Sequence, residues 1–298
     1  MTDPLAGAGL LIIDKDSGMT SHDVVSRCRK LLHTRKIGHA GTLDPMATGV
    51  LVLGVERATK MLGLLSLTTK AYTATIRLGQ ATSTDDAEGD PLSTTDATHV
   101  TDTEIAAVVT ELTGDIQQVP ATVSAIKVDG QRAYARHRAG EQVQLAPRPV
   151  TVSRFDIQSR RNTDSFVDLD VIVECTSGTY IRALARDLGA ALTVGGHLTA
   201  LRRTRVGPFT LDHARTLAAL ADNPTVSLDI DAAAKIAFPQ RIVSDVEADD
   251  LRNGRRPAPI GATGIHAAYT HDGRAIALIE EKAGRVVPAL VIRPANLV

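Results

Sequence analysis

The sequence has no tryptophan and few aromatic residues of any kind, since Phe and Tyr make up 3% of its 298 residues. It has two cysteines, Cys28 and Cys175, with neither Cys-x-x-Cys spacing nor a histidine cluster beside them. This pattern excludes a disulfide framework and a zinc site of the usual spacing, and it fits the reducing cytoplasm. The first apolar run, residues 10–13, is too short for a signal peptide or a membrane span. We therefore expect a cytoplasmic protein with no membrane association.

The bulk composition is that of an ordinary globular protein. Hydrophobic residues make up 43% of the chain and charged residues 22%, far from the composition of disordered chains. A chain of 298 residues is long enough to bury a sizeable core. We expect two domains, residues 1–237 and 238–298.

The net charge of -1 hides a strong segregation of charge along the chain. Residues 82–115 contain nine acidic residues and no Lys or Arg, whereas residues 127–161 contain eight Lys or Arg against three Asp or Glu. Residues 24–43 contain five basic residues and no acidic one. Basic stretches are more commonly solvated faces with no ligand. A phosphate-binding surface is the alternative.

The first fifty residues predict a strand, a helix and a second strand. Residues 10–13 are all apolar, which indicates a buried strand. The helix is expected to be capped by Ser21, because apolar residues then recur at three- and four-residue spacing. Residues 38–49, with three glycines and a proline, predict a loop, and residues 50–53 resume as a strand.

The rest of the chain alternates strands and helices up to about residue 220. Residues 71–78 and 167–175 predict strands, the second with one apolar and one solvated face. Residues 180–188 predict a helix that Gly189 stops, with Tyr180 and Arg182 in its first turn.

The last eighty residues change in character. Residues 221–240 predict irregular structure, and short strands at 275–279 and 286–292 flank Gly284. A boundary near Phe238 and a small β-rich module after it follow from this change.

Three residues are candidates for catalysis. Asp44 lies in a glycine-rich loop that holds its carboxylate at a fixed angle, although Asp-Pro in such a loop is usually turn chemistry. Arg182 is suited to keep a carboxylate ionised, and a surface arginine is as good an interpretation from spacing alone. Tyr72 is one of few residues able to stack on a base, although core packing is its more ordinary role.

Two other patterns resemble known functional motifs but are incomplete. The Ser-x-x-Lys pattern of Ser124 and Lys127 is typical of acyl-enzymes, but the chain has no Ser-Asp-Asn or Lys-Thr-Gly to complete that site. The acidic residues at 85–90 lack the alternating ligand spacing of a calcium loop, so we expect an acidic surface turn.

An ordered set of segments resembles the TruB family of bacterial tRNA pseudouridine synthases. The segment Gly38-His39-Ala40-Gly41-Thr42-Leu43-Asp44-Pro45 resembles the catalytic region of that family, and Asp14-Lys15 precedes it. The resemblance extends over about residues 9–215, and chance would not reproduce so many segments in one order. The further matching segments are residues 58–60, 70–72, 78–80, 84–89, 120–130, 177–182 and 197–204.

The resemblance implies an α+β fold. It is a pseudouridine synthase core with a central mixed, largely antiparallel sheet flanked by helices, and an RNA-gripping insertion at about residues 120–150. The C-terminal module is similar to a shortened PUA domain, a small β-rich fold. The implied substrate is uridine 55 in the T-arm loop of tRNA, with no cofactor, no metal and no obligate protein partner, and we expect a monomer.

The resemblance also implies roles for particular residues. Asp44 matches the catalytic aspartate, Tyr72 the tyrosine that stacks on the target base, and Arg182 the arginine paired with the aspartate. The substrate-binding residues expected beside these three are His39, Tyr180, Leu201, Lys15 and Arg132.

Two other functions stay open at this point. A non-enzymatic tRNA chaperone would retain the fold and the basic surface, while a serine acyl-enzyme would use Ser124. The presence of Asp44, Tyr72 and Arg182 together favours the enzyme that isomerises uridine.

Overall fold

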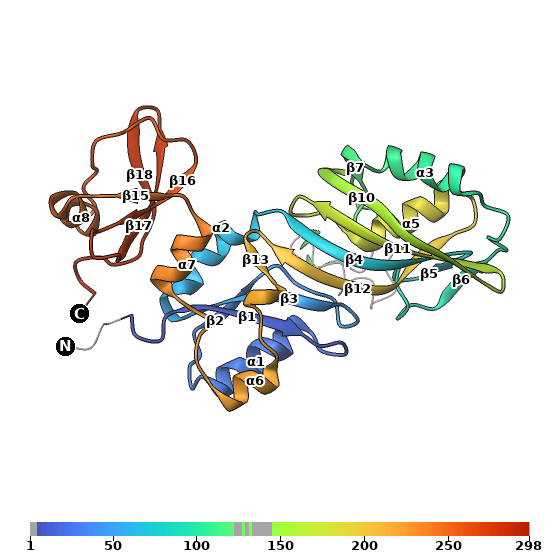
Figure 1. Ribbon diagram of the computed structural model, residues 1–298, viewed down its shortest axis with the longest axis horizontal. Helices are drawn as coiled ribbons and strands as arrows, with labels where there is room; N and C mark the ends of the chain where they lie inside the picture. Colours follow the sequence, from blue (N-terminus) through green and yellow to red (C-terminus); the bar gives the residue numbers. More distant parts are fainter. Residues whose placement is uncertain (1–4, 122–126, 129–130, 133–144, 298) are drawn as a thin grey trace. The chain divides into compact units, whose positions relative to one another are not determined.

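The computed structural model describes residues 5–121, 127–128, 131–132 and 145–297 (Figure 1). The described chain divides into two compact units, each built on β-strands with helices packed against them. The first unit comprises residues 5–44, 50–66 and 206–297, and the second comprises residues 45–49 together with the described part of 67–205. None of the helices in these ranges is long and apolar enough to cross a membrane.

The first unit begins with strands that pair in the order β14-β1-β3, with β2 added antiparallel to β3. The predicted strands at 10–13 and 50–53 are confirmed as β1 and β3. Its elements are β1 (Gly9–Lys15), α1 (Ser21–Leu31), β2 (Ile37–Ala40), β3 (Thr48–Val55), the 3-10 helix η1 (Glu56–Met61), α2 (Leu62–Ser66), β13 (Phe209–Thr210), the 3-10 helix η2 (Leu211–His213), α6 (Leu217–Asp222), β14 (Leu228–Asp229), α7 (Ile230–Ala237), β15 (Gln240–Ile242), α8 (Asp245–Arg252), β16 (Ile265–Tyr269), β17 (Ala275–Lys282) and β18 (Arg285–Val291).

Three local predictions for this unit were wrong. Helix α1 is capped by Thr20, whose side chain exchanges hydrogen bonds with Asp23 in a capping box, and not by Ser21. Residues 38–49 are not one loop, because β2 takes the first of them and β3 the last. Residues 221–240 contain β14 and the two-turn helix α7, whose N-cap is Asp229.

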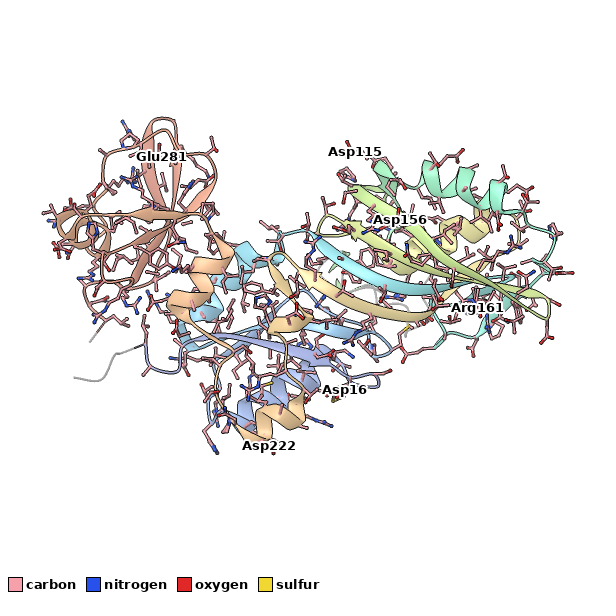
Figure 2. The ribbon with its side chains drawn as sticks, viewed as in Figure 1. Asp16, Asp115, Asp156, Arg161, Asp222 and Glu281 are labelled. Atoms are coloured by element: carbon pink, nitrogen blue, oxygen red, sulfur yellow. The ribbon has the colours of Figure 1, made fainter. Side chains whose placement is uncertain are left out.

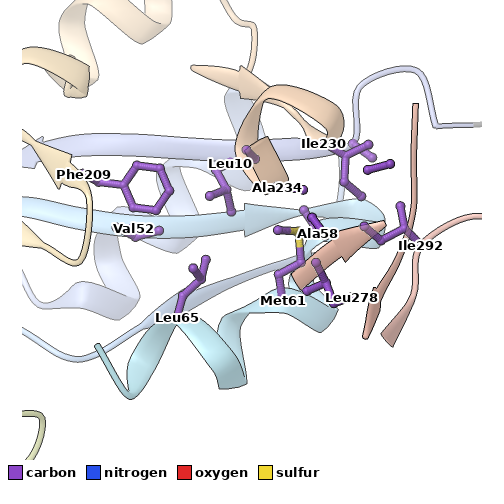
Figure 3. Close-up of a cluster of buried hydrophobic side chains, with 14 of the residues drawn as sticks. Leu10, Val52, Ala58, Met61, Leu65, Phe209, Ile230, Ala234, Leu278 and Ile292 are labelled. Carbon is purple, nitrogen blue, oxygen red and sulfur yellow. The ribbon is translucent and has the colours of Figure 1, made fainter. Parts of the chain in front are cut away.

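The C-terminal strands share the larger apolar cluster of the first unit, and a second cluster that includes Leu251 and Ile276 lies among the C-terminal elements. Leu10 of β1 and Val52 of β3 belong to the larger cluster together with Ile230 of α7 (Figure 3). Leu278 of β17 and Ile292 belong to the same cluster. Burial of this common apolar surface stabilises the C-terminal module against the rest of its unit.

The C-terminal module is β-rich, as predicted. Its strands pair in the order β15-β16-β17-β18, and β17 and β18 form a hairpin. Ala283 and Gly284 at the turn both have positive φ, which matches the twist that a tight hairpin requires. The predicted boundary after residue 237 stays a prediction.

The second unit is built on strands in the order β12-β4-β11-β10-β7 (Figure 1). All these pairings with printed register are antiparallel, and the first residues of β3 pair in parallel with β12, so the sheet is mixed, as predicted. Its elements are β4 (Lys70–Leu78), β5 (Gln80–Thr82), β6 (Pro91–Thr94), α3 (Asp102–Glu111), β7 (Gly114–Gln118), β8 (Lys127–Val128), β9 (Gln131–Arg132), β10 (Arg148–Thr163), β11 (Phe166–Cys175), α5 (Ile181–Ala191) and β12 (Gly196–Val206).

The two faces of this second sheet differ, as the alternation in β11 predicted. Val167, Leu169 and Val171 are at most 1% exposed on one face. On the other face Asp168 pairs with Arg77 of β4, and the remaining acidic side chains of β11 pair with arginines. Helix α5 packs against β4 and helix α3 against β10.

Candidate active site

Asp44 lies in the first unit, in the short loop that joins β2 to β3. The Ser21 hydroxyl accepts a hydrogen bond from the Leu43 backbone N–H at 2.9 Å and donates to the Leu43 carbonyl at 3.2 Å. Gly41 has a φ of +85°, which a residue with a side chain rarely adopts. The residue before Asp44 is therefore tied to the start of α1, and Asp44 itself is half-buried.

Two predicted substrate-binding residues lie in the same unit. His39 is in β2, opposite Leu53 of β3, and its ring packs edge-on against His22 with 5.5 Å between ring centroids. Lys15 ends β1, is fully buried, and donates from Nζ to the Asp16 carbonyl at 2.8 Å. Their contact with a substrate stays a prediction.

Arg182 lies in the first turn of α5 in the second unit and is 3% exposed. Its Nη1 donates to the Thr84 carbonyl at 2.7 Å and lies 3.4 Å from Oδ2 of Asp86. A buried arginine is costly unless its charge is paired and its N–H groups are bonded. Arg182 is therefore a fixed buried cation and not a surface arginine, and its pairing with Asp44 stays a prediction.

The acidic segment that sequence reasoning placed on the surface supplies this partner, so that prediction was wrong for two residues. Asp85 is 8% exposed and Asp86 is 2% exposed. The Thr84 hydroxyl and the Glu88 backbone N–H both donate to Asp86. Burial raises the pKa of Asp85 above its usual value, although the Arg186 guanidinium 3.3 Å away opposes the shift.

Three more predicted site residues lie in the second unit. Tyr72 is opposite Val173 in the β4–β11 ladder, so its ring is on the apolar face of the sheet, and it is 7% exposed. Tyr180 is the N-cap of α5, two residues before Arg182. Leu201 is buried in the middle of β12. The second unit thus carries an aromatic ring, an apolar wall and the Arg182–Asp86 pair.

Sequence reasoning missed a buried cation beside Tyr72. Lys70 is opposite Cys175 in the same ladder, and its Nζ donates to the Thr68 carbonyl at 3.0 Å. Burial, together with the positive charge of Arg203, which is itself 1% exposed, lowers the pKa of Lys70 to about 8. Nothing in the spacing of lysines distinguishes Lys70 from a solvated residue.

The basic stretch at 127–161 is partly neutralised by the chain itself. Arg154 pairs with Asp156 at 2.6 Å, Arg160 with Asp102 at 2.6 Å, and Arg161 with Asp170. Figure 2 labels Asp156 and Arg161, both in β10. Because these ion pairs leave less positive charge for phosphates, the predicted contact with RNA depends on the basic residues that precede β10. The Arg132 backbone belongs to β9, and its side chain is outside the described residues.

Two further sequence features are the Ser-x-x-Lys pattern and the cysteines. Ser124 is outside the described residues. Cys28 and Cys175 are both free and buried, and burial raises the pKa of their thiols to about 12 and about 11. Thiols with such pKa values are poor nucleophiles at neutral pH.

Comparison with known proteins identifies the family of this chain. The model of the TruB family pseudouridylate synthase N-terminal domain matches residues 29–181. Two C-terminal domain models follow, tRNA pseudouridylate synthase B over residues 182–239 and tRNA pseudouridine synthase II over residues 238–293. The chain has the fold of a pseudouridylate synthase, and it belongs to the TruB family.

Individual relatives agree along the whole chain. A protein named tRNA pseudouridine synthase B from Nocardia farcinica is 72% identical over 99% of this chain and 96% of its own length. Another of that name from Rhodococcus jostii is 68% identical over 98% of this chain and 96% of its own length. A solved structure described as a Cbf5-Nop10-Gar1 complex contains a chain with 25% identity and a TM-score of 0.73, covering 98% of this chain and 87% of that one.

Proposed function

We propose that the protein isomerises uridine 55 in the T-arm loop of tRNA to pseudouridine, with Asp44 as the catalytic carboxylate. The observation that carries the proposal is the near full-length match to relatives named tRNA pseudouridine synthase B. The local structure agrees with this function, because Ser21 holds Leu43 in the loop of Asp44 and Asp86 pairs with Arg182.

The reaction needs no external atom. The bond from uracil N1 to the ribose C1′ breaks, the ring turns, C5 bonds to C1′, the proton leaves C5, and N1 takes up a proton. Asp44 adds to uracil C6, adds to C1′, or assists a glycal intermediate, and these three routes share one requirement, an ionised carboxylate. A cation close to that carboxylate keeps it ionised, which is the role that we propose for Arg182.

The target base must leave the folded T-arm loop to reach this site. Flipping a base costs a few kcal/mol, and stacking on an aromatic ring returns about 1–3 kcal/mol. Tyr72 offers such a ring on the apolar face of the sheet. We propose Tyr180 and Leu201 as the neighbouring pocket and His39 as the residue that holds the loop open. Lys15 and Arg132 are proposed as further contacts to the tRNA.

We also propose that the protein acts as a monomer in the cytoplasm without an obligate protein partner. Size-exclusion chromatography with light scattering, in the presence and absence of one equivalent of tRNA, tests this. A dimer mass in either sample contradicts it.

The function is tested by mapping pseudouridine in an unmodified tRNA transcript after incubation with the protein. We expect one new pseudouridine at position 55 and none in a transcript with cytidine there. Pseudouridine elsewhere contradicts the position. A protein that refolds tRNA without making pseudouridine is the chaperone alternative.

A further inference from the structure

Gln118, the last residue of β7, is a buried polar residue outside the predicted set of catalytic and substrate-binding residues. It is 1% exposed, whereas its neighbour Gln117 is exposed on the opposite face of the strand. A buried amide is costly unless both its donor and its acceptor are satisfied. The hydrogen-bond partners of Gln118 therefore indicate the structural role of its buried side chain.

Both partners belong to the backbone of one residue, Tyr180. The Gln118 Oε1 accepts the Tyr180 N–H at 2.8 Å, and Nε2 donates to the Tyr180 carbonyl at 3.1 Å. Tyr180 is the N-cap of α5, and a tyrosine side chain is too long to cap its own helix as Ser or Asp would. The side chain of Gln118 therefore fixes the backbone from which α5 begins.

A second contact joins the same two elements. The Arg186 Nη2 donates to the Val119 carbonyl at 2.7 Å, and its Nη1 lies 3.3 Å from Asp85. Arg186 is one turn after Arg182 in α5, and Asp85 adjoins Asp86, which pairs with Arg182. The end of β7 is thus connected at two successive residues to the helix that carries the buried cation.

We propose that Gln118 is a positioning residue for the reaction. It holds the Tyr180 backbone, and through it the Tyr180 ring and the Arg182 guanidinium, in the geometry that the chemical step requires. Displacements of about 1 Å in such groups slow a reaction by about a hundredfold. This inference rests on the proposed function, because it assigns Gln118 to the chemical step and not to tRNA affinity.

The test compares single-turnover rates of pseudouridine formation, tRNA dissociation constants and melting temperatures for Gln118→Ala and the matched variant Gln117→Ala. We expect Gln118→Ala to react about 10- to 100-fold more slowly, with a dissociation constant within about threefold of the parent. Gln117→Ala is expected to equal the parent in all three measurements, because its side chain is exposed on the other face.

Gln118→Glu supplies a signature that a purely structural role would not give. A protonated glutamate, like glutamine, has one donor and one acceptor, while an ionised one repels the Tyr180 carbonyl. The rate of Gln118→Glu relative to the parent should therefore rise as pH falls from 8 to 6. This ratio also tests the positioning role of Gln118 if Gln118→Ala does not fold.

The outcomes separate the inference from the proposed function. A parent that makes no pseudouridine contradicts the proposed function, and this inference with it. An active parent whose Gln118→Ala variant reacts at the parental rate per folded molecule contradicts only the inference. A pH-independent ratio for Gln118→Glu also contradicts it.

Discussion

Arg182 and Asp86 form an ion pair inside the second unit, with 3.4 Å between Nη1 and Oδ2 and side chains that are 4% and 3% exposed. Asp86 is held in turn by the Thr84 hydroxyl and the Glu88 backbone N–H. Removing one partner of a buried pair is strongly destabilising, by about 3–5 kcal/mol, because the other charge stays buried. Arg182 thus depends on Asp86 for its position and its stability.

Asp86→Asn should lower both the free energy of unfolding and the single-turnover rate of pseudouridine formation. The amide retains the shape of the carboxylate and removes its charge, so Arg182 is held less firmly. We expect a rate loss of about tenfold or more, measured on protein shown to be folded by circular dichroism. Asp90→Asn, an exposed acid in the same segment, is the control and should retain the parental rate. Equal single-turnover rates for Asp86→Asn and Asp90→Asn would show that Asp86 does not contribute to the reaction.

We propose two separable roles for Tyr72, stacking of its ring on uracil and proton transfer by its hydroxyl. Tyr72→Phe should bind tRNA nearly as the parent does and turn over about a hundred- to ten-thousand-fold more slowly, the usual contribution of a general acid or base. Tyr72→Leu also loses stacking worth about 1–3 kcal/mol, so it should be worse in both respects. A near-parental single-turnover rate for Tyr72→Phe would show that the hydroxyl moves no proton.

The salt dependence of tRNA binding distinguishes arginines that bind RNA from arginines paired within the protein. Replacing Arg132, Arg136 and Arg138 together should reduce the slope of log affinity against log salt concentration by roughly one unit for each lost phosphate contact. The matched triple variant replaces three arginines that already pair with acids: Arg154, Arg160 and Arg161. It should change the slope less. A slope equal to that of the parent in the variant lacking Arg132, Arg136 and Arg138 would identify the basic run as a solvated face.

Lys70 should make the stability of the protein depend on pH in an unusual window. Its folded pKa of about 8 is below the unfolded value of 10.5, so the unfolded chain binds more protons between these values. The free energy of unfolding should therefore rise from pH 8 to 10.5 relative to Lys70→Met, by roughly 3 kcal/mol in full. Urea unfolding of both proteins at several pH values measures the difference. A difference that does not change with pH would show that the amine keeps its ordinary pKa.

The sequence was sufficient to predict β4 and β11, because their apolar alternation records which face is buried, whereas β10 and β12 were not predicted. β11 is the clearest case, since Val167 and every second residue after it are buried. Helix α7 was missed because its short alanine-rich run lies between prolines and gives a weak periodic signal. Gly189 was expected to stop α5, yet the helix continues through it to Ala191. A Cβ on Gly189 would lie 2.2 Å from the Gly195 carbonyl carbon, so this glycine permits close packing of the chain.

The chemistry of the site was predictable from sequence only where a motif carried it. Asp44, Tyr72 and Arg182 belong to segments that resemble a family, whereas Asp86 and Gln118 act through contacts between residues distant in sequence. Gln117 and Gln118 are identical neighbours, and only the fold determines which of the two is buried. Such long-range partners leave no local pattern in a single sequence.

We propose that the Asp44 carboxylate is required for the isomerisation that replaces the C5–H bond of a tRNA uridine. The most direct measurement is tritium release from a tRNA transcript labelled with [5-³H]uridine, since pseudouridine formation replaces the bond from C5 to hydrogen. We predict release by the parent and no detectable release by Asp44→Asn, which retains the shape of the side chain and its binding of tRNA while losing its nucleophilicity. Release by Asp44→Asn within about tenfold of the parent, or about 1.4 kcal/mol in the barrier, would contradict the account.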